Sequence, residues 1–253
     1  METTFKPVLS VITVVYNNVK HIERTLRSVI NQTYSSIEFI VIDGASNDGT
    51  FAILEKYKNH FSQFISEPDK GIYHAMNKGL ALAKGDYVIF MNSGDEFYEP
   101  QTVEQVFSTQ AFADIYYGET EMLDERLESQ GKRRHKAPEK LSLESFKYGM
   151  SVSHQAIYIK RSITNPYNAK YQLSADIDWI LDALTKAKLV INTNRYVAKY
   201  LMGGMSKKRH RLSLTERYRI FKKHYGFLPN LINHGVIAVK LASYWLIKGK
   251  TND

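Results

Sequence analysis

The chain has 253 residues, of which 43% are hydrophobic and 24% are charged, and its formal net charge is +8. This composition is typical of a globular protein and excludes a disordered or collagen-like chain. The sequence contains no Cys, so disulfides, thiolate metal sites and cysteine nucleophiles are excluded. The N-terminal segment lacks the pattern of a secretory signal, and no uncharged apolar run approaches the roughly 20 residues that span a bilayer. We therefore expect a cytoplasmic protein, or one bound peripherally to the inner face of the plasma membrane.

Strand and helix patterns alternate over the first hundred residues. Buried, β-branched runs predict strands, and apolar residues at i, i+4 and i+7 predict helices. The expected strands are 8–16, 37–42, 64–66 and 87–91, and the expected helices are 21–31, 50–57 and 72–83. Strands separated by helices form βαβ units with a parallel sheet, in which ligands bind beyond the carboxyl ends of the strands.

The pattern is weaker in the second half of the chain. We expect a polar hairpin of 115–123 with 127–133, strands at 156–159 and 197–202, and a helix at 176–186. The pair Gly203-Gly204 then precedes a basic stretch, 206–224, in which eight Lys or Arg residues stand against one Glu. Such a contrast predicts that the tail and the near-neutral body have different roles. We therefore divide the chain into one domain, 1–205, and a basic helical extension, 206–253.

Common nucleotide-binding and hydrolase motifs are absent from the sequence. The first strand is not followed by G-x-G-x-x-G, and neither G-x-x-x-x-G-K-[ST] nor G-x-S-x-G occurs. A nucleotidyltransferase would carry a Gly- and Arg/Lys-rich phosphate loop near the first strand, but Tyr16-Asn17-Asn18 occupies that position. These absences disfavour a Rossmann dehydrogenase, a P-loop nucleotidase and a nucleotidyltransferase.

Acidic residues follow two of the predicted strands. Asp43 lies in VIDGASNDGT, where a carboxylate can accept hydrogen bonds from a base edge or a ribose, and Asp48 is equally compatible with capping the next helix. Asp95 closes NSGD, where it is either a turn residue or a ligand of a hard divalent cation.

Three further acids precede or begin helices. Asp69 lies before the helix that carries His74, where an acid is commonly an N-terminal cap. Asp176 and Asp178 are at i and i+2, so they point to different sides of a helix start. The one that faces a cleft is able to accept a proton from an attacking hydroxyl, although acids in a first turn also simply complement the helix dipole.

The motifs VLSVITVVYNN, VIDGASNDGT and EPDKGIYHAMNKGLALAKGDYVIFMNSGDEF occur in an order that resembles the family-2 inverting glycosyltransferases. The resemblance is strong over 9–98 and continues more loosely through SVSHQAIYIKRS and SADIDWIL to GGMS. It implies an α/β protein with the GT-A (nucleotide-diphospho-sugar transferase) fold, a mostly parallel central sheet flanked by helices, and a C-terminal helical extension. Within the family, the chain looks most like bacterial enzymes that build surface polysaccharide or lipopolysaccharide.

The resemblance also assigns roles to positions of this sequence. Asp95 is the expected metal residue, since Asn92 and Gly94 replace two acids of a motif that often reads Asp-x-Asp-Asp, and Asp176 is the expected general base, with Ala175 in place of a Glu. The expected nucleotide-binding residues are Thr13, Val15, Tyr16, Asn17, Asp43, Asp69, Asn92, Ser93 and Gly94. The expected acceptor-side residues are His154, Gln155 and Asp178, and the expected residues around the diphosphate and its closing loop are Met205, Ser206, His210 and Arg211.

These roles imply a sugar transfer that inverts the anomeric centre, from a nucleotide diphosphate sugar, with UDP favoured, to a hydroxyl of a glycan or a lipid-linked acceptor. The expected cofactor is Mn²⁺ or Mg²⁺. Two alternatives remain: an inactive homologue that only binds nucleotide, suggested by Asn92 and Gly94, and a nucleic-acid-binding protein that uses the basic tail. The aromatic residues of the tail lie at helical spacing rather than in a stacking ladder, so nucleic acid is not an expected partner.

The tail itself predicts helices. Ser213-Leu214-Thr215-Glu216 is a capping-box pattern, and it predicts a helix start. The apolar residues Leu214, Tyr218, Phe221 and Tyr225 would share one face of that helix. The apolar segment 235–247 is too short and too charged to span a bilayer. We expect these helices to lie on an anionic membrane surface; the alternative is that they pack on the body or on a second subunit in a homo-oligomer.

Overall fold

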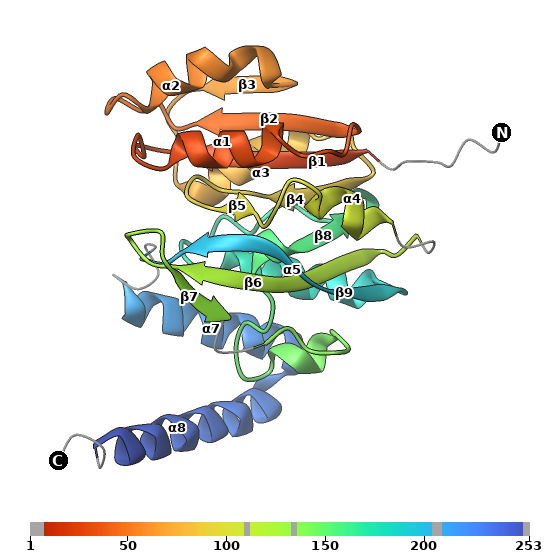
Figure 1. The fold of residues 1–253 in the computed structure, drawn as a ribbon. Coiled ribbons are helices and arrows are strands. Elements are labelled where there is room, and N and C mark those ends of the chain that lie inside the picture. Colours follow the sequence, from red (N-terminus) through yellow and green to blue (C-terminus); the bar gives the residue numbers. More distant parts are fainter. Residues whose placement is uncertain (1–7, 109–111, 133–135, 204–208, 250–253) are drawn as a thin grey trace.

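The computed structural model describes residues 8–108, 112–132, 136–203 and 209–249. These residues form one nine-stranded sheet in the order β3-β2-β1-β4-β8-β6-β9-β5, with β7 paired to β6 at the side (Figure 1). The strands are β1 (Leu9–Val15), β2 (Ile37–Asp43), β3 (Gln63–Ser66), β4 (Tyr87–Phe90), β5 (Glu96–Phe97), β6 (Ile115–Leu123), β7 (Ser129–Lys132), β8 (Ile157–Lys160) and β9 (Val190–Leu201). The helices are α1 (Ile22–Ile30), α2 (Thr50–Tyr57), α3 (Ile72–Leu82), α4 (Thr102–Phe107), α5 (Ala175–Lys186), α7 (His210–Tyr225) and α8 (Phe227–Gly249).

The first four strands of the chain form the predicted parallel half of the sheet. Strand β1 pairs in parallel with both β2 and β4, and β2 pairs in parallel with β3. Every residue of β1 is buried, as its unbroken apolar pattern predicts. Helix α3 packs on this half so closely that a Cβ atom at Gly79 would lie 2.4 Å from Cγ2 of Ile12. A larger residue at 79 would therefore displace the helix whose N-terminus borders the site.

The second half of the sheet is mixed. Strand β8 is antiparallel to β4 and to β6, while the long β9 runs parallel to β6 and antiparallel to β5. The predicted hairpin of β6 with β7 is present, but β6 is not a polar edge strand, because it lies between β8 and β9 with Tyr116 and Tyr117 buried. Strand β9 begins well before the predicted 197, because its pairing with β6 continues through polar residues such as Asn192.

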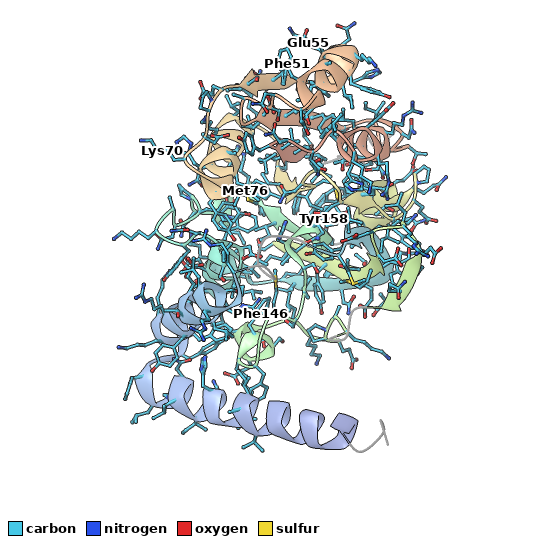
Figure 2. All side chains as sticks on the ribbon, turned by 90° about the vertical axis from the view of Figure 1, so that its left-hand side faces the viewer. Phe51, Glu55, Lys70, Met76, Phe146 and Tyr158 are labelled. Atoms are coloured by element: carbon cyan, nitrogen blue, oxygen red, sulfur yellow. The ribbon has the colours of Figure 1, made fainter. Side chains whose placement is uncertain are left out.

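An aromatic stack joins the two halves. Tyr167 stacks on Tyr73 of α3 and on Trp179 of α5, with ring centroids 5.4 and 5.0 Å apart, and Phe90 of β4 meets Tyr167 edge to face. Each such pair contributes about 0.5–1.5 kcal/mol beyond its buried area. The stack therefore sets the start of α5 against α3. Figure 2 shows Met76 and Tyr158 inside the body, whereas Lys70, before α3, points outward.

Helices α7 and α8 differ in how they meet the body. Helix α7 packs on α5 and contributes Ile220 and Phe221 to the core, whereas α8 extends away from the sheet (Figure 1). The predicted capping box is wrong: α7 begins at His210, and both Ser213 and Glu216 are buried inside it against the body. The predicted apolar stripe is also shifted, since Leu214 is exposed and Ile220 is buried. In the described part of the chain, no helix combines the length and apolar character needed to cross a membrane.

Candidate active site

A cavity of about 1070 Å³ opens beyond the carboxyl ends of β1 and β4, where ligands bind in parallel sheets. One wall comes from the loops after β1 and β2 and from the turn before α3. The floor is the turn 92–95 after β4, and the opposite wall comes from 150–155, the start of α5 and the end of β9. These seven separate parts of the chain therefore border one space.

Asp176, in the first turn of α5, lines this cavity. The Tyr73 hydroxyl donates to Oδ1 of Asp176 at 3.2 Å, and Nδ1 of His154 lies 3.5 Å from Oδ2. Burial alone would raise the pKa of Asp176, but the contact with His154 and the charges of His154 and Arg217 lower it below its ordinary value. Asp176 is therefore an ionised carboxylate at neutral pH, with a proton-accepting group open to the cavity.

His154 joins the two sides of the floor. Its Nε2 atom lies 3.2 Å from Nδ2 of Asn92, and its Nδ1 atom faces Asp176. An imidazole that carries its proton on Nδ1 donates toward the carboxylate and accepts from the amide. In that arrangement Oδ1 of Asn92 is buried and has no hydrogen-bond partner among the described residues. An unsatisfied acceptor on the cavity floor is suited to a cation or a donor from a ligand.

Asp95 lies in the same turn as Asn92 and is 6% exposed. Burial raises the pKa of Asp95 to about 7, although the charge of His154 and hydrogen bonding from Leu201 and Gln155 oppose that rise. Among the described residues, the carboxyl group therefore has no Lys or Arg as an ion-pair partner. A buried carboxylate and an unpaired amide oxygen on one turn are hard oxygen ligands, and they fit Mg²⁺ or Mn²⁺. Gln155 also lines the cavity, and its assignment to the acceptor side stays a prediction.

The expected nucleotide-binding residues divide into two groups. Val15, Tyr16 and Asp69 line the cavity, together with Asn92, Ser93 and Gly94. Oδ1 of Asp69 forms an ion pair with Nζ of Lys78 at 2.6 Å and contacts His74 at 2.9 Å, while its buried Oδ2 has no hydrogen-bond partner among the described residues. Asp69 is thus not a cap of α3, whose first residue follows Gly71 without a side-chain cap. It offers a free carboxylate oxygen to a ligand.

The other group, Thr13, Asn17 and Asp43, is absent from the cavity lining. The Thr13 hydroxyl donates to the Met91 carbonyl at 2.7 Å, between β1 and β4. The fully buried Asp43 carboxylate accepts from the Ser66 hydroxyl at 2.6 Å and also from Ser46. These contacts hold the sheet and the loop after β2, and the assignment of these residues to the nucleotide stays a prediction.

Asn17 has a similar linking role. It adopts φ +46, and its Oδ1 accepts from the Asn47 backbone N–H at 2.9 Å, which joins the loops after β1 and β2. Asn tolerates this left-handed conformation better than most residues. The loop carrying Tyr16 is therefore held in place from β2. Tyr16 itself is 65% exposed, so its ring is available to a ligand at the cavity edge.

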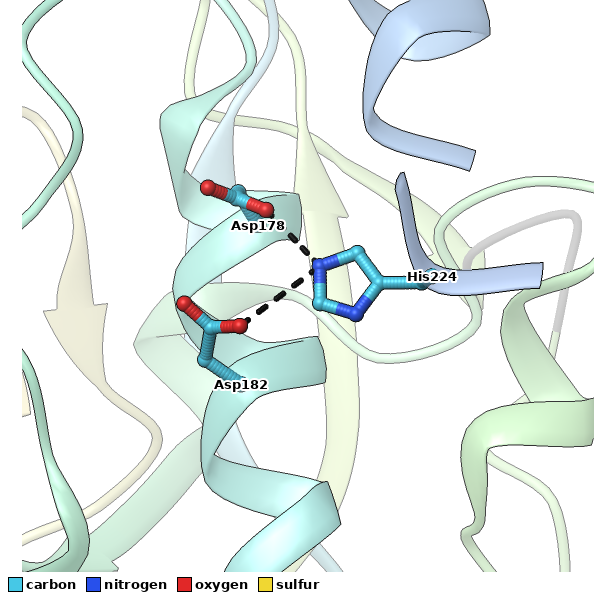
Figure 3. Close-up of side chains that lie close together, drawn as sticks. All are labelled: Asp178, Asp182 and His224. Atoms are coloured by element: carbon cyan, nitrogen blue, oxygen red, sulfur yellow. Dashed lines mark hydrogen bonds and ion pairs between the residues drawn. The ribbon is translucent and has the colours of Figure 1, made fainter. Parts of the chain in front are cut away.

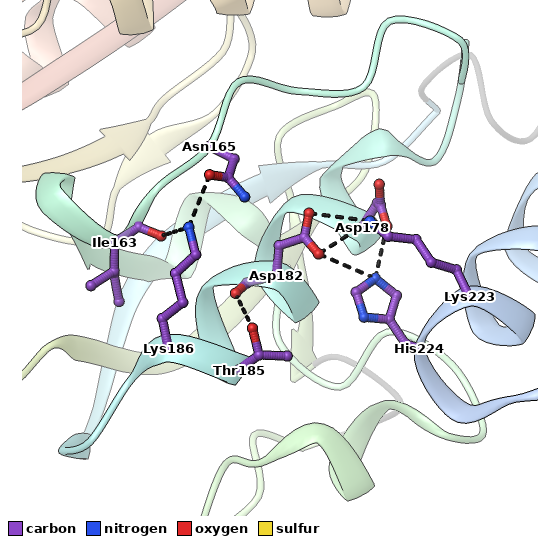
Figure 4. Close-up of polar contacts among 8 residues, drawn as sticks. All are labelled: Ile163, Asn165, Asp178, Asp182, Thr185, Lys186, Lys223 and His224. Carbon is purple, nitrogen blue, oxygen red and sulfur yellow. Dashed lines mark hydrogen bonds and ion pairs between the residues drawn. The ribbon is translucent and has the colours of Figure 1, made fainter.

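Asp178 does not lie on the acceptor side of the cavity, contrary to expectation. Its carboxylate is buried against α7, where Oδ1 lies 2.7 Å from Nε2 of His224 and 2.9 Å from Nζ of Lys223 (Figures 3 and 4). Burial opposes ionisation, but these two partners lower the pKa of Asp178. The physical reason is the i, i+2 spacing in the first turn, which sends Asp176 to the cavity and Asp178 to the neighbouring helix.

Asp178, Asp182 and His224 also have the spacing of a metal site, with ligand atoms within 4.8 Å of one another (Figure 3). However, the Lys223 ammonium already contacts both carboxylates, at 2.9 and 3.1 Å (Figure 4). The positive charge that balances these carboxylates is therefore supplied by α7. This cluster fastens α7 to α5.

The expected residues of the closing loop are only partly covered by the structure. Met205 and Ser206 lie outside the described residues, and His210 is described only as the first residue of α7. Arg211 is exposed on α7 and is not part of the cavity lining. The assignment of these four residues to the diphosphate stays a prediction.

Three residues that shape the site are among those that the sequence analysis missed. Tyr73 supplies a hydroxyl to Asp176, and Arg217 lines the cavity from α7. Glu216 is the third, because its carboxylate accepts from the backbone N–H groups of Gln172 and Leu173, which precede α5. Arg217 and Glu216 belong to the charged stretch 206–224. Which of its residues are buried depends on how α7 packs, and no local sequence pattern identifies them.

Comparison with known proteins agrees with this geometry. The model of the family described as "Glycosyl transferase family 2" matches residues 10–163. An uncharacterized glycosyltransferase of Mycobacterium tuberculosis is 35% identical over 190 residues, which cover 71% of this chain and 70% of that protein. A PGL/p-HBAD biosynthesis glycosyltransferase of Mycobacterium bovis is 28% identical over 214 residues, 79% of each chain.

Solved structures share the fold. Residues 1–349 of Staphylococcus aureus TarS, in complex with UDP, superpose with a TM-score of 0.67 at 18% identity, over 94% of this chain and 72% of that one. This chain spans 43% of a longer TarS chain. A mannosyltransferase of Pyrobaculum calidifontis, in complex with GDP-Man and Mn²⁺, gives a TM-score of 0.64 over 96% of this chain and 72% of that one. The sequence match over most of the sheet and the agreement in fold lead to one conclusion: this chain belongs to glycosyltransferase family 2 and has the GT-A fold.

Proposed function

We propose that this glycosyltransferase moves a sugar, with inversion, from a nucleotide diphosphate sugar to a hydroxyl group of a glycan or lipid-linked acceptor in the synthesis of bacterial surface polysaccharide. The observation that carries the proposal is the convergence of Asp69, Asp95 and Asp176 on one cavity. A sugar nucleotide needs groups that bind its nucleoside and its diphosphate, and the acceptor hydroxyl needs a base. The three carboxylates supply one group for each need.

The related proteins support this substrate class. The TarS structures include complexes with UDP and with UDP-GlcNAc, and the archaeal mannosyltransferase holds GDP-Man and Mn²⁺. Other relatives are described as glycosyltransferases of PGL/p-HBAD biosynthesis and of teichuronic acid biosynthesis, the latter from Bacillus subtilis. We favour UDP as the nucleotide product. The donor sugar is a hexose or an N-acetylhexosamine in this proposal.

Asp176 acts as the general base in the proposed reaction. Its carboxylate accepts the proton of the acceptor hydroxyl as that oxygen bonds to the anomeric carbon, and the bond from that carbon to the nucleoside diphosphate breaks with its electron pair going to the phosphate oxygen. The contact with His154 keeps Asp176 ionised before the reaction. Tyr73, which donates to the other carboxylate oxygen, orients the base.

The turn 92–95 is the proposed place of the divalent cation. Asp95 and Oδ1 of Asn92 would hold it, and Gly94 between them adopts φ +106, a conformation that favours glycine. When bound, a divalent cation neutralises the charge that develops on the departing diphosphate. The chain's own contribution is to bury these oxygens and keep water from them. Val15, Tyr16 and the free oxygen of Asp69 are the proposed contacts of the nucleoside and its ribose.

We also propose that α8 lies on the anionic inner surface of the membrane, where it would bring the enzyme to a lipid-linked acceptor. In the described part of α8, Leu228, Leu231 and Ile232 are more than half exposed, and the helix extends away from the body (Figure 1). Exposed apolar residues on a helix next to the basic α7 suit an interfacial helix, because apolar burial and attraction to anionic lipids act together.

The proposed function is tested by nucleotide binding and donor cleavage. Thermal unfolding is measured with UDP, GDP and dTDP, each with and without Mn²⁺. One diphosphate should raise the melting temperature, and more so with Mn²⁺, since a ligand that binds only the folded state stabilises it. The matching sugar nucleotide should then be slowly hydrolysed. Binding without any hydrolysis or transfer would identify a nucleotide-binding homologue without activity, and no binding at all would overturn the proposal.

A further inference from the structure

Arg217 belongs to α7, yet its side chain lines the catalytic cavity. Its Nε atom is buried and has no hydrogen-bond partner among the described residues. Within the same residues, Arg217 takes part in none of the ion pairs. A guanidinium group stays charged, so burial of its Nε–H group without a partner is unfavourable. This side chain therefore has unused hydrogen-bonding capacity at the cavity wall.

The position of Arg217 is set by the residues around it on α7. The neighbouring Glu216 carboxylate accepts from the backbone N–H groups of Gln172 and Leu173, at 2.7 and 2.9 Å. Ile220 and Phe221, one turn further on, are buried in the core. Glu216 thus anchors α7 directly to the segment that leads into Asp176. Arg217 is a fixed part of the wall, and not a solvated residue of a basic tail.

Arg217 lies on the acceptor side of the cavity. It lines the same cavity as Gln172, Leu173 and Asp176, and its charge is close enough to lower the pKa of Asp176. The wall that carries Tyr16 comes from β1 and the loop after it, toward the other end of the sheet from α7 (Figure 1). A ligand group beside both Arg217 and the base is therefore more naturally part of the acceptor than of the nucleoside.

We propose that Arg217 binds an oxyanion of the acceptor, a phosphate or a carboxylate, next to the hydroxyl that Asp176 deprotonates. The planar guanidinium forms paired hydrogen bonds with either group. This inference rests on the proposed function, and it deepens it by naming the acceptor as an anionic molecule. The phosphate would come from a lipid phosphate or a phosphodiester chain, and the carboxylate from a uronic acid.

The test uses the full chain saturated with UDP and Mn²⁺. Octyl phosphate, octyl glucuronide and the neutral octyl glucoside are titrated into it by calorimetry. The wild-type protein should bind one of the two anions at least about tenfold more tightly than the neutral glycoside, and Arg217→Gln should abolish this preference without changing the affinity for UDP. The better of the two anions identifies the source of the oxyanion. Arg217→Lys should retain part of the preference, because it keeps the charge but not the paired geometry.

Arg219→Gln is the matched control, since it removes the same charge from an exposed position on the same helix. It should leave the affinity for UDP and the preference for the anionic ligand unchanged. Three results would overturn the inference: equal binding of the anionic and neutral glycosides by the wild type, an equal loss of preference in Arg219→Gln, or a marked loss of UDP affinity in Arg217→Gln, which would place the side chain on the donor diphosphate. Failure of the wild type to bind any nucleotide would instead overturn the proposed function, and this inference with it.

Discussion

Nδ1 of His154 lies 3.5 Å from the Asp176 carboxylate, while Nε2 of the same ring lies 3.2 Å from the Asn92 amide. One imidazole thus connects the proposed general base with the turn that carries the proposed metal residues. Through this ring, a change at one site alters the electrostatics of the other, because the charge of His154 lowers the pKa of both Asp176 and Asp95 relative to burial alone. The effects of variants at these positions should therefore not be additive.

Replacement of Asp176 by Asn should abolish the base and leave the cavity intact. Sugar transfer should fall by about 10²–10⁴-fold, the usual contribution of general-base catalysis. Binding of UDP, measured by calorimetry, should be unchanged. Asp182→Asn makes the same chemical change on the same helix but outside the cavity lining, and it should transfer sugar at nearly the wild-type rate. Near-wild-type transfer by Asp176→Asn would show that another group takes the proton.

Replacement of His154 by Leu should change the pH dependence of transfer. The wild-type histidine lowers the pKa of Asp176, so its removal raises that pKa. Because the reaction needs the ionised carboxylate, the acidic limb of the kcat–pH profile should move to higher pH, with activity lost earlier as the pH falls. The check is the pH–rate profile of both proteins. An unchanged acidic limb would mean that Asp176 does not control it.

Chelation should stop transfer if the cation site is as proposed. EDTA should abolish activity, and added Mn²⁺ or Mg²⁺ should restore it, because the developing diphosphate charge would otherwise be unbalanced. Asp95→Ala should not recover at the metal concentration that restores the wild type, whereas Asn92→Ala, which keeps the carboxylate, should recover at a higher one. Full activity after thorough chelation would refute the metal site, and leaving-group stabilisation would then fall to a basic residue of the cavity wall.

Replacement of Asp178 by Ala should destabilise the fold and spare the chemistry. It leaves His224, whose side chain is 5% exposed, and Lys223 with Asp182 as their remaining carboxylate partner, so the loss should be roughly 1–3 kcal/mol, below the cost of a buried charge left wholly unpaired. Glu144→Ala breaks an exposed pair with Lys147 instead and should cost less than about 1 kcal/mol. Urea unfolding measures both changes. Equal stability losses would contradict the assigned role of Asp178.

The same variant has a defined pH dependence. The folded protein lowers the pKa of Asp178, so this carboxylate contributes its full stability above the unfolded-state pKa of about 4 and loses that contribution as the pH falls through the lower folded-state value. The stability gap between wild type and Asp178→Ala should therefore be constant near neutral pH and shrink only below about pH 4. A gap that already closes between neutral pH and the ordinary pKa of an aspartate would contradict this linkage.

Membrane association should depend on the exposed face of α8. The full chain should co-sediment with vesicles that contain phosphatidylglycerol, and less so at high salt, because screening weakens attraction to anionic lipid. The combined variant Leu228→Ser, Leu231→Ser and Ile232→Ser should lose this binding. The substitutions lie at exposed positions, so the body should stay folded.

A second triple variant controls for the loss of exposed apolar residues. It carries Phe51→Ser, Leu127→Ser and Leu189→Ser, all at exposed positions away from α8. This protein should bind vesicles as the wild type does. Equal sedimentation of all three proteins would refute the membrane proposal and leave contact with another subunit as the use of α8. Removal of the whole tail is a poorer experiment, since α7 carries core residues.

Local sequence determined the parallel half of the fold. Unbroken β-branched runs predicted β1, β2 and β4 to within about two residues, because such runs are stable only when both sheet faces are buried. The same local order placed Asp95 at the end of a strand and Asp176 at the start of a helix. Asp95 therefore lies at the carboxyl edge of the parallel half, where ligands bind. Asp176 follows the antiparallel β8, and the segment 164–174 brings the start of α5 back to the same cavity, which only the tertiary structure shows.

Tertiary structure decided which face of each polar helix is used. Ser213 and Glu216 have the spacing of a capping box, but Glu216 bonds to the backbone of Gln172 and Leu173, far away in sequence. The packing of α7 on α5 also explains two other differences from the sequence-based expectations. Asp178 contacts Lys223 and His224 instead of lying on the acceptor side, and Arg217 lines the cavity instead of lying in a solvated tail. A charged residue has no intrinsic preference for one face of a helix. Its role depends on which residue it contacts once it is buried. For these residues, that contact is defined only by the packing of α7 on α5.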